Sequence, residues 1–192
     1  PVGTNSYHGT MVTSIAAGRG ESEILGAAPK AELLSVSIAF GIEGLDTDSQ
    51  IADGIIWAVD NGEKNQFIFD KKFRVLAREL GPGVFARIVA AAGNRSEGTE
   101  QVSAPASIPG VISVAGLDKN GAPSQNFSTS GFSIGVTAPA EDLIGAFPGG
   151  EYRMWSGTSG ATPIVSGMVA LIRSMYPEMN AANVVNRVIN SA

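Results

Sequence analysis

Stretches with helical spacing of apolar residues alternate along the whole chain with short, continuous apolar runs. Continuous apolar runs are typical of strands that are buried on both faces of a sheet. Their alternation with helices predicts an α/β fold, a mainly parallel sheet with helices on both faces. In such sheets the functional residues lie at the carboxyl ends of strands and at the starts of the helices that follow. Candidate catalytic and binding residues are therefore expected at these positions.

The expected elements follow from the spacing of apolar residues and from the stop signals between them. Met11, Val12 and Ile15 predict a first helix that ends at Gly18, and 164–175 is apolar enough on nearly every face for a buried helix. A second helix is expected after a cap at Asp48, with Ile51, Ile55, Ile56 and Val59 on one face and Gly62 as its stop, and a last helix over 180–190. Strands are expected at 31–40, 67–69, 88–92, 111–115 and 134–137, with a turn-rich stretch at 120–130.

Composition removes several classes of protein. The 192 residues predict one domain over 1–192, and 44% hydrophobic residues with only 16% charged residues exclude a disordered chain. The chain has no cysteine and one histidine, which excludes thiolate metal sites, thiol nucleophiles, disulfides and multi-histidine metal centres in these residues. A net charge of −5 with scattered Lys and Arg gives no footprint for nucleic acid. The apolar runs are far shorter than the roughly 20 residues of a membrane span.

The single histidine, His8, stands at the expected start of the first helix. Near the positive end of the helix dipole the neutral imidazole is favoured, and a neutral ring accepts a proton. The plainer interpretation is a histidine that only forms local hydrogen bonds at the helix start. The sequence around it leaves both open.

Ser159 stands at the amino end of the apolar helix, between Gly157 and Gly160. A serine at this position commonly caps a helix. The two glycines, however, allow another group to approach its hydroxyl, and Pro163 favours a helix start nearby. The backbone N–H groups of a first turn also point at whatever such a hydroxyl attacks.

Asn94 follows an expected strand in the sequence Ala-Ala-Ala-Gly-Asn at 90–94. Gly-Asn is most often a simple turn. At the carboxyl end of a strand, however, the side-chain amide is placed to donate to a developing oxyanion, an interaction worth roughly 1.5–3 kcal/mol.

Together these three segments resemble the subtilisin-like serine peptidases, the subtilases. Residues 8–10 match that family's H-G-T around its catalytic histidine, and 90–94 match the segment that carries its oxyanion-hole asparagine. Residues 157–163 match the G-T-S-x-A-x-P around its nucleophile, and the order His, Asn, Ser is the family's order. The stretch 154–172 is similar in particular to the mycosins, actinobacterial subtilases associated with type VII secretion. Further agreement lies in 26–29, 104–106, 110–114 and 176–177.

The resemblance implies a serine endopeptidase that acts on peptide or protein substrates. Ser159 would attack the peptide carbonyl, His8 would act as general base, and Asn94 with the backbone N–H of Ser159 would hold the oxyanion. A propeptide or another N-terminal segment is a further expected partner. One wall of the substrate pocket would be formed by Ala91, Ala92 and Gly93.

The family's third catalytic residue is an aspartate in a D-[ST]-G pattern before the histidine. The seven residues before His8 include no acidic residue, and Asp46, Asp48 and Asp53 follow it without matching that pattern. We therefore expect a subtilisin-like domain that lacks its N-terminal strand and, with it, the triad aspartate.

The segment 63–87 departs from the family as well. After the A-V-x-x-G of 58–62 the family continues into a strand that ends in S-x-G and binds the substrate backbone as an added strand. Here 67–69 still reads as a strand, but no S-x-G follows it. A helix at 73–80 and the link Gly-Pro-Gly at 81–83 complete this divergent segment.

Two function classes stay open: an active serine endopeptidase, and a catalytically silent subtilase-like domain with a binding or structural role. A D-[ST]-G motif upstream in the gene would favour the first. An esterase of the α/β-hydrolase fold is excluded, because Ala161 stands where its G-x-S-x-G motif needs glycine and because its histidine follows its serine.

No cofactor is clearly indicated, and no metal site is assigned. The family allows a structural calcium ion, for which Asp46 and Asp48, two positions apart, give a weak signal that a solvated turn explains equally well. The resemblance implies secretion or attachment to the cell envelope in a bacterium. No positively charged start followed by an apolar run is found in this chain.

Overall fold

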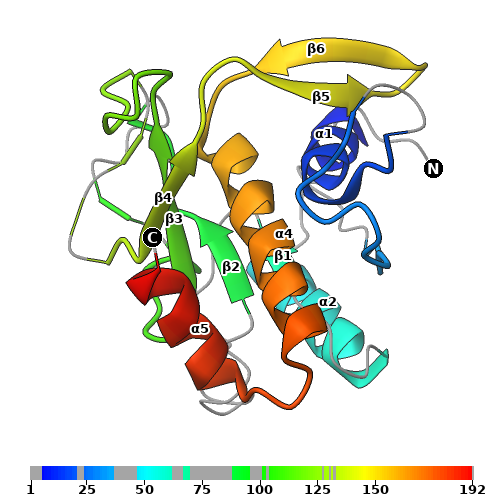
Figure 1. Cartoon of the computed structure of the whole chain (residues 1–192), viewed down its shortest axis with the longest axis vertical. Helices are drawn as coiled ribbons and strands as arrows, with labels where there is room; N and C mark the ends of the chain where they lie inside the picture. The colour runs from blue at the N-terminus through cyan, green and yellow to red at the C-terminus, as the bar shows by residue number, and fades with distance from the viewer. Residues whose placement is uncertain are drawn as a thin grey trace.

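A four-stranded parallel sheet forms the centre of the computed structural model (Figure 1). The residues that the structure describes are 6–20, 24–36, 47–61, 67–69, 88–95, 101–102, 104–126, 128–129, 131 and 133–191. The strands are neighbours in chain order and all run parallel: β1 (Phe67–Phe69), β2 (Ile88–Ala91), β3 (Ile112–Leu117) and β4 (Val136–Pro139). The predicted α/β fold is confirmed, and so are the strands at 67–69, 88–92 and 111–115, with β4 starting two residues later than expected.

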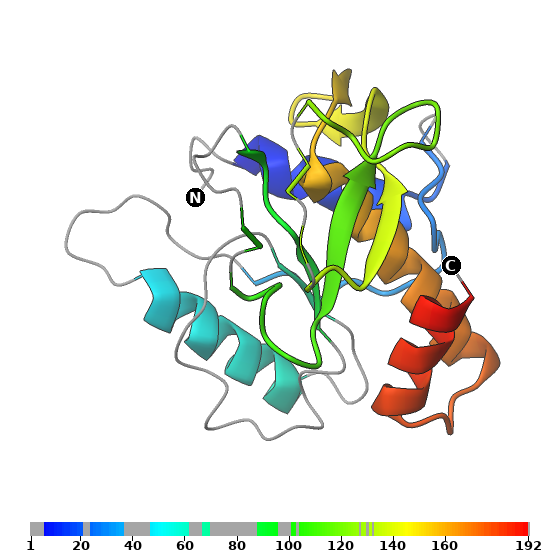
Figure 2. The same cartoon turned by 90° about the vertical axis from the view of Figure 1, so that its left-hand side faces the viewer.

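Helices cover both faces of this sheet. Helix α4 (Thr158–Met175) and helix α5 (Ala181–Asn190) lie on one face, and α2 (Thr47–Asn61) lies on the other (Figures 1 and 2). Helix α1 (Ser6–Ala17) packs beside α4. The core between the sheet, α4 and α5 consists of small and branched apolar side chains, among them Val89, Ile112, Val114, Val165, Val169, Val184 and Val188.

The helix boundaries follow from local capping. Asn180 caps α5, because its side chain accepts a hydrogen bond of 2.9 Å from the backbone N of Asn183. Helix α1 ends where predicted, and Gly18 N donates to Ser14 O across its last turn. Helix α2 begins at Thr47, so Asp48 lies inside its first turn and the prediction that Asp48 caps it is wrong.

The predicted strand at 31–40 does not form over its described part. Residues 31–36 are not in a strand, and Leu33, Leu34 and Val36 are 54%, 42% and 38% exposed. An apolar run becomes a strand only where a neighbouring strand takes up its backbone hydrogen bonds, and residues 31–36 are not paired with the described sheet. Residues 37–40 lie outside the described residues.

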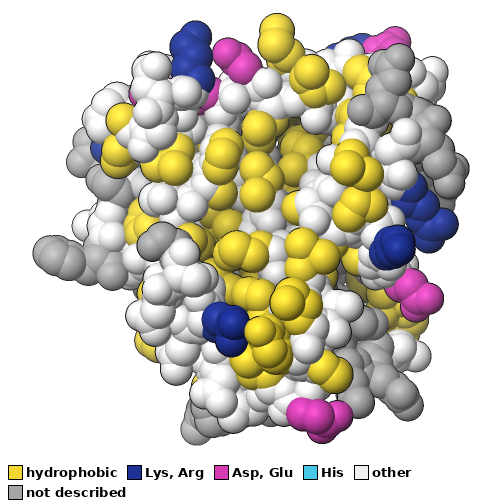
Figure 3. Space-filling view, in the orientation of Figure 1, with side chains coloured by type: hydrophobic (Ala, Val, Ile, Leu, Met, Phe, Trp, Pro, Cys, Tyr) yellow, Lys and Arg dark blue, Asp and Glu magenta, His cyan; other side chains and the backbone are white. Residues whose placement is uncertain are grey.

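Helix α4 is buried only along its first half. Thr158–Pro163, Val165 and Val169 are buried, whereas Leu171 is 48% exposed and Met175 is 70% exposed. Hydrophobic side chains cover the middle of this face of the molecule, where α4 lies in the same view (Figure 3). The prediction of a helix buried on nearly every face is therefore wrong for the second half, because α5 and the sheet cover only one side of it.

A β-hairpin between the sheet and α4 was not predicted. Its strands β5 (Leu143–Phe147) and β6 (Glu151–Trp155) are antiparallel, and Leu143 pairs with Trp155. Gly149 and Gly150 adopt φ values of +89° and +79° in the turn, which favour glycine. The sequence signal was present, because Pro148-Gly149-Gly150 separates two short runs with apolar residues.

The predicted helix at 73–80 and the Gly-Pro-Gly link at 81–83 lie outside the described residues.

Within the described part of the chain, no helix has the length and apolar character to cross a membrane.

Candidate active site

His8 lies in the first turn of α1 and is half-buried. Its ring stands against the indole of Trp155, with the ring centroids 5.7 Å apart and the planes at 74°. Because Trp155 ends strand β6, just before α4 begins, this contact brings the start of α1 to the start of α4.

Ser159 is the second residue of α4 and is 6% exposed. The residue before the helix, Gly157, has φ +150°, a conformation that favours glycine. A Cβ on Gly160 would lie 2.7 Å from Leu143 Cδ1, closer than real contacts allow. The backbone thus favours glycine at 157, and a side chain at 160 would have to displace the end of the Leu143 side chain.

Asn94 lies three residues after the carboxyl end of β2 and is half-buried. Its Oδ1 accepts hydrogen bonds from the backbone N and the Oγ1 of Thr158, each at 3.1 Å. Since both partners donate to Oδ1, the Nδ2 amide points away from Thr158 and has its two N–H groups on the opposite side. The end of β2 and the start of α4 are thus joined beside Ser159.

Gly157 lies between Asn94 and Trp155. A Cβ at this position would be 3.5 Å from Trp155 Nε1 and 3.6 Å from both Nδ2 and Oδ1 of Asn94. Trp155 contacts His8, and Gly157, beside Asn94 and Trp155, directly precedes the helix that carries Ser159. The structure therefore brings the segments that contain His8, Asn94 and Ser159 into one region. These are the three segments that the sequence singled out.

The residues predicted to line the pocket differ in their exposure. Ala91 is 9% exposed and Ala92 is fully buried, whereas Gly93 is half-buried. Gly93 adopts φ +107°, and its carbonyl accepts a 3.1 Å hydrogen bond from Thr129 N. The methyl groups of the two alanines therefore pack into the protein. Of the three residues, Gly93 is the most exposed, and it offers only its backbone to solvent.

The residues considered for calcium give no cluster in the described part. Asp46 and the side chain of Asp48 lie outside it, and within it no group of three His, Asp or Glu residues is arranged to hold a metal ion. A structural calcium ion remains a prediction.

Two residues of this region had no role assigned from the sequence. Thr158 fixes the amide of Asn94, and Trp155 packs on His8. Both lie within four residues of Ser159 in the chain, but their partners are remote in sequence, and only the tertiary structure reveals the contacts.

Comparison with known proteins identifies the family of this chain. The sequence model of the Subtilase family matches residues 1–192. A thermostable alkaline protease of Halalkalibacterium halodurans is 34% identical over 199 residues, which cover 98% of this chain and 53% of that protein. The chain thus spans about half the length of this relative.

Solved structures agree with the sequence relatives. The prenylagaramide maturation protease PagA has a TM-score of 0.75 and 31% identity, covering 97% of this chain and 72% of PagA. MycP1 from Mycobacterium smegmatis has a TM-score of 0.74 and 26% identity, covering 94% of this chain and 62% of MycP1. The resemblance to the mycosins is thus matched in structure, and PagA has a nearly equal TM-score at a higher sequence identity.

Proposed function

Since the chain belongs to the subtilase family, we propose that it is a serine endopeptidase with Ser159 as nucleophile, His8 as general base and Asn94 as oxyanion donor. One observation carries the proposal: Thr158 holds Oδ1 of Asn94 right beside Ser159. The amide is therefore orientated with its N–H groups available to a substrate oxygen. An asparagine in a simple turn would not need that anchor.

The proposed reaction begins when Ser159 Oγ forms a bond to the peptide carbonyl carbon and its proton passes to His8. The carbonyl oxygen becomes an oxyanion, which accepts hydrogen bonds from Asn94 Nδ2 and from the backbone N–H of Ser159. His8 then gives the proton to the amide nitrogen as the C–N bond breaks, which leaves an ester between the acyl group and Ser159 Oγ. Water, deprotonated by His8, attacks the acyl carbon, and His8 returns this proton to Ser159 Oγ as the ester bond breaks. The start of α4 supports the oxyanion through its helix dipole.

The pocket for the residue before the cut bond is proposed to include Ala91, Ala92 and Gly93. With two methyl groups packed inward, the contribution of this wall is mostly backbone, which suits an extended peptide lying close to it. Binding there would not depend on the charge of the substrate side chain.

The same proposal includes peptide or protein substrates and secretion or attachment to the cell envelope. Among the relatives, PagA is a maturation protease for prenylagaramide, and one MycP1 structure comes from the ESX-1 type VII secretion system. The absence of cysteine is compatible with an exported bacterial protein. A propeptide or other N-terminal segment is the proposed partner within the whole protein.

A catalytically silent domain is the second candidate, because the family's activity depends on an aspartate whose D-[ST]-G motif does not occur in these 192 residues. In a serine peptidase that aspartate fixes the tautomer of the imidazole and raises its strength as a base, so a domain that never acquires it would be silent. The retention of His8, Asn94 and Ser159 in one region argues for the peptidase. The two candidates differ in whether Ser159 is activated, which can be measured directly.

The test is labelling of the purified protein with a fluorophosphonate, followed by intact-mass analysis. We expect one label on the protein, none on Ser159→Ala, and full labelling of Ser174→Ala, an exposed serine of the same helix. His8→Ala should slow labelling by about 10²-fold or more, the scale for loss of a general base. Labelling that persists in Ser159→Ala would refute the assignment of the nucleophile. A folded protein that takes up no label would favour the silent domain.

A further inference from the structure

We propose that the β5–β6 hairpin is the positioning element of this site, which holds His8 on α1 in a fixed place relative to Ser159 on α4. Trp155 and Gly145 act as positioning residues: Trp155 sets the place of His8 by packing against its ring, and Gly145 acts through Met11 of the same helix. The proposal rests on the function proposed above, because a fixed distance between these two residues matters only if they react together.

The hairpin packs closely on both helices at positions without side chains. On the α1 side, a Cβ on Gly145 would lie 2.5 Å from Cγ of Met11, a fully buried residue one turn after His8. On the α4 side, Leu143 packs against Gly160, the residue after Ser159. Contacts this close leave little freedom for either helix to shift relative to the hairpin.

Hydrogen bonds lock the same arrangement. Ser14 Oγ donates to Met11 O at 2.7 Å and accepts from Ala146 N of β5 at 2.9 Å, which ties the backbone of α1 to the hairpin. At the other end, Ser156 Oγ accepts from Asp142 N at 3.0 Å, which ties the start of β5 to the approach to α4. The hairpin is thus bonded to α1 and to the segment that carries Ser159.

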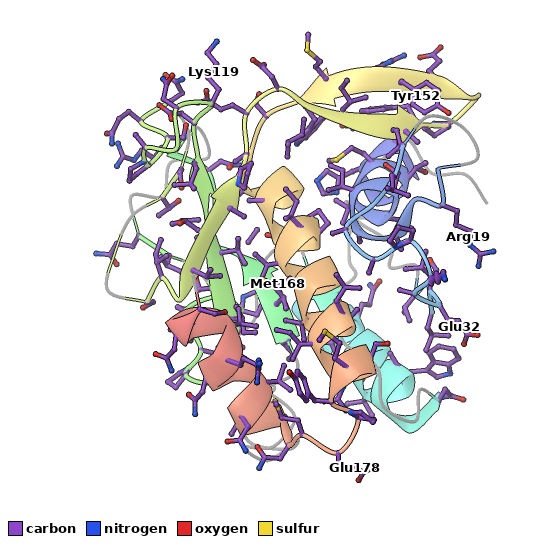
Figure 4. All side chains as sticks on the ribbon, viewed as in Figure 1. Arg19, Glu32, Lys119, Tyr152, Met168 and Glu178 are labelled. Atoms are coloured by element: carbon purple, nitrogen blue, oxygen red, sulfur yellow. The ribbon has the colours of Figure 1, made fainter. Side chains whose placement is uncertain are left out.

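Aromatic rings complete the link at His8 itself. Tyr7, the residue before it, stacks on Phe147 of β5 with centroids 5.9 Å apart and planes at 8°. The indole of Trp155 in β6 contacts the ring of His8, and the ring centroids of Trp155 and Phe147 are 6.4 Å apart. Figure 4 shows side chains in the space between the hairpin, where Tyr152 is labelled on β6, and α1 below it in that view.

The physical consequence concerns orientation. A misplacement of about 1 Å between reacting groups costs on the order of 10²-fold in rate. In a triad the aspartate fixes the imidazole through a hydrogen bond to one ring nitrogen, and packing against the faces and edges of the ring restrains it further. In this chain the indole of Trp155 stands edge-on against the His8 ring, and this contact restrains the orientation of the ring.

The first test needs no activity, since His8 is the only histidine and gives a single set of imidazole NMR signals. Gly145→Ala forces Met11 away and should shift the His8 signals. Gly135→Ala, just before β4, is the matched control, because its Cβ would make only ordinary contacts of 3.5–3.7 Å. This variant should leave the His8 signals unchanged. Unshifted His8 signals in a folded Gly145→Ala protein would overturn the proposal, as would an equal shift in Gly135→Ala.

The second test measures the rate of fluorophosphonate labelling of Ser159 in the same variants. Gly145→Ala should lower it by roughly 10- to 100-fold, with Gly135→Ala close to the unaltered protein. If Gly145→Ala does not fold, Ser14→Ala is the second variant, because it removes the hydrogen bond from Ala146 N. We expect Ser14→Ala to shift the His8 signals and to slow labelling by a smaller factor than Gly145→Ala. An unlabelled parent protein would contradict the proposed function, yet the NMR shifts would still decide whether the hairpin positions His8. Shifted His8 signals with an unchanged labelling rate would overturn the positioning role.

Discussion

Thr158 donates two hydrogen bonds to one atom of Asn94: its backbone N and its Oγ1 both bond to Oδ1 at 3.1 Å. The two residues are 64 positions apart in the chain, one at the end of β2 and the other at the start of α4. The candidate nucleophile and the candidate oxyanion donor are therefore not placed independently. Any movement of Ser159 along the helix start also moves the anchor of Asn94.

Thr158→Val tests this coupling. Valine keeps the shape of the buried side chain but removes the Oγ1 donor, while the backbone N still bonds to Oδ1. A single hydrogen bond contributes about 1 kcal/mol, so we expect kcat to fall roughly fivefold with KM nearly unchanged. Steady-state kinetics on a peptide substrate provide the measurement. A change confined to KM would show that the bond serves binding and not the transition state.

Asn94→Ala removes the donor itself. The oxyanion exists only near the transition state, so kcat should fall more than KM rises, by about 10²–10³-fold. Measuring kcat and KM separately is essential, and unfolding by urea should be followed in parallel to show that the variant is folded. If KM alone changes, Asn94 is not the oxyanion donor.

Gly167→Ala should destabilise the protein although alanine favours helices. Its Cβ would collide with Ala27 and lie 3.1 Å from Ala16 O and Ala28 N, where the segment after α1 crosses α4. Overpacking of this kind costs about 1–3 kcal/mol, more than the roughly 1 kcal/mol gained from helix propensity.

The matched control for that experiment is Gly9→Ala in α1, where a Cβ meets nothing within 4 Å. It should raise the free energy of unfolding by about 0.5–1 kcal/mol. Urea unfolding followed by circular dichroism compares the two variants. Equal effects of both substitutions would mean that propensity and not the crossing at Gly167 decides stability.

The sequence predicted those parts of the fold that depend on neighbours along the chain. Val89 and Val114 lie in continuous apolar runs, and both are fully buried strand residues. Asn94 and Ser159 were found because strand ends and helix starts are where α/β sheets carry their functional side chains.

What the sequence did not predict depends on partners remote in the chain. Leu33 and Leu34 have a strand-like pattern but are exposed, since a strand needs a neighbour that sequence spacing does not supply. In the same way, the contact of Trp155 with His8 exists only because the hairpin folds back onto α1. Local patterns therefore locate the candidate residues, whereas the means of holding them in place appears only in three dimensions.

Asp118 provides a test of acid stability away from the site. Its Oδ1 accepts hydrogen bonds from the backbone N of Ala122 at 2.9 Å and of Asn120 at 2.8 Å. These bonds, that from Ala122 most of all, hold the pKa of Asp118 below its ordinary value of 3.8, against the opposing effect of burial. A carboxyl with a lowered pKa stabilises the folded protein above the ordinary value, and this contribution is lost as the pH falls through the lowered one.

Asp118→Asn keeps an oxygen acceptor but removes the charge. We therefore expect the variant to unfold at a lower urea concentration than the parent near neutral pH, and the difference to shrink as the pH falls below the ordinary pKa of the carboxyl. Urea unfolding between about pH 2 and pH 7 measures it. A difference that stays constant over this range would mean that the geometry of the turn, and not the carboxylate charge, accounts for the stabilisation. A difference that grows toward low pH would contradict the lowered pKa itself, because it requires a carboxyl that binds its proton more tightly in the folded protein than in the unfolded chain.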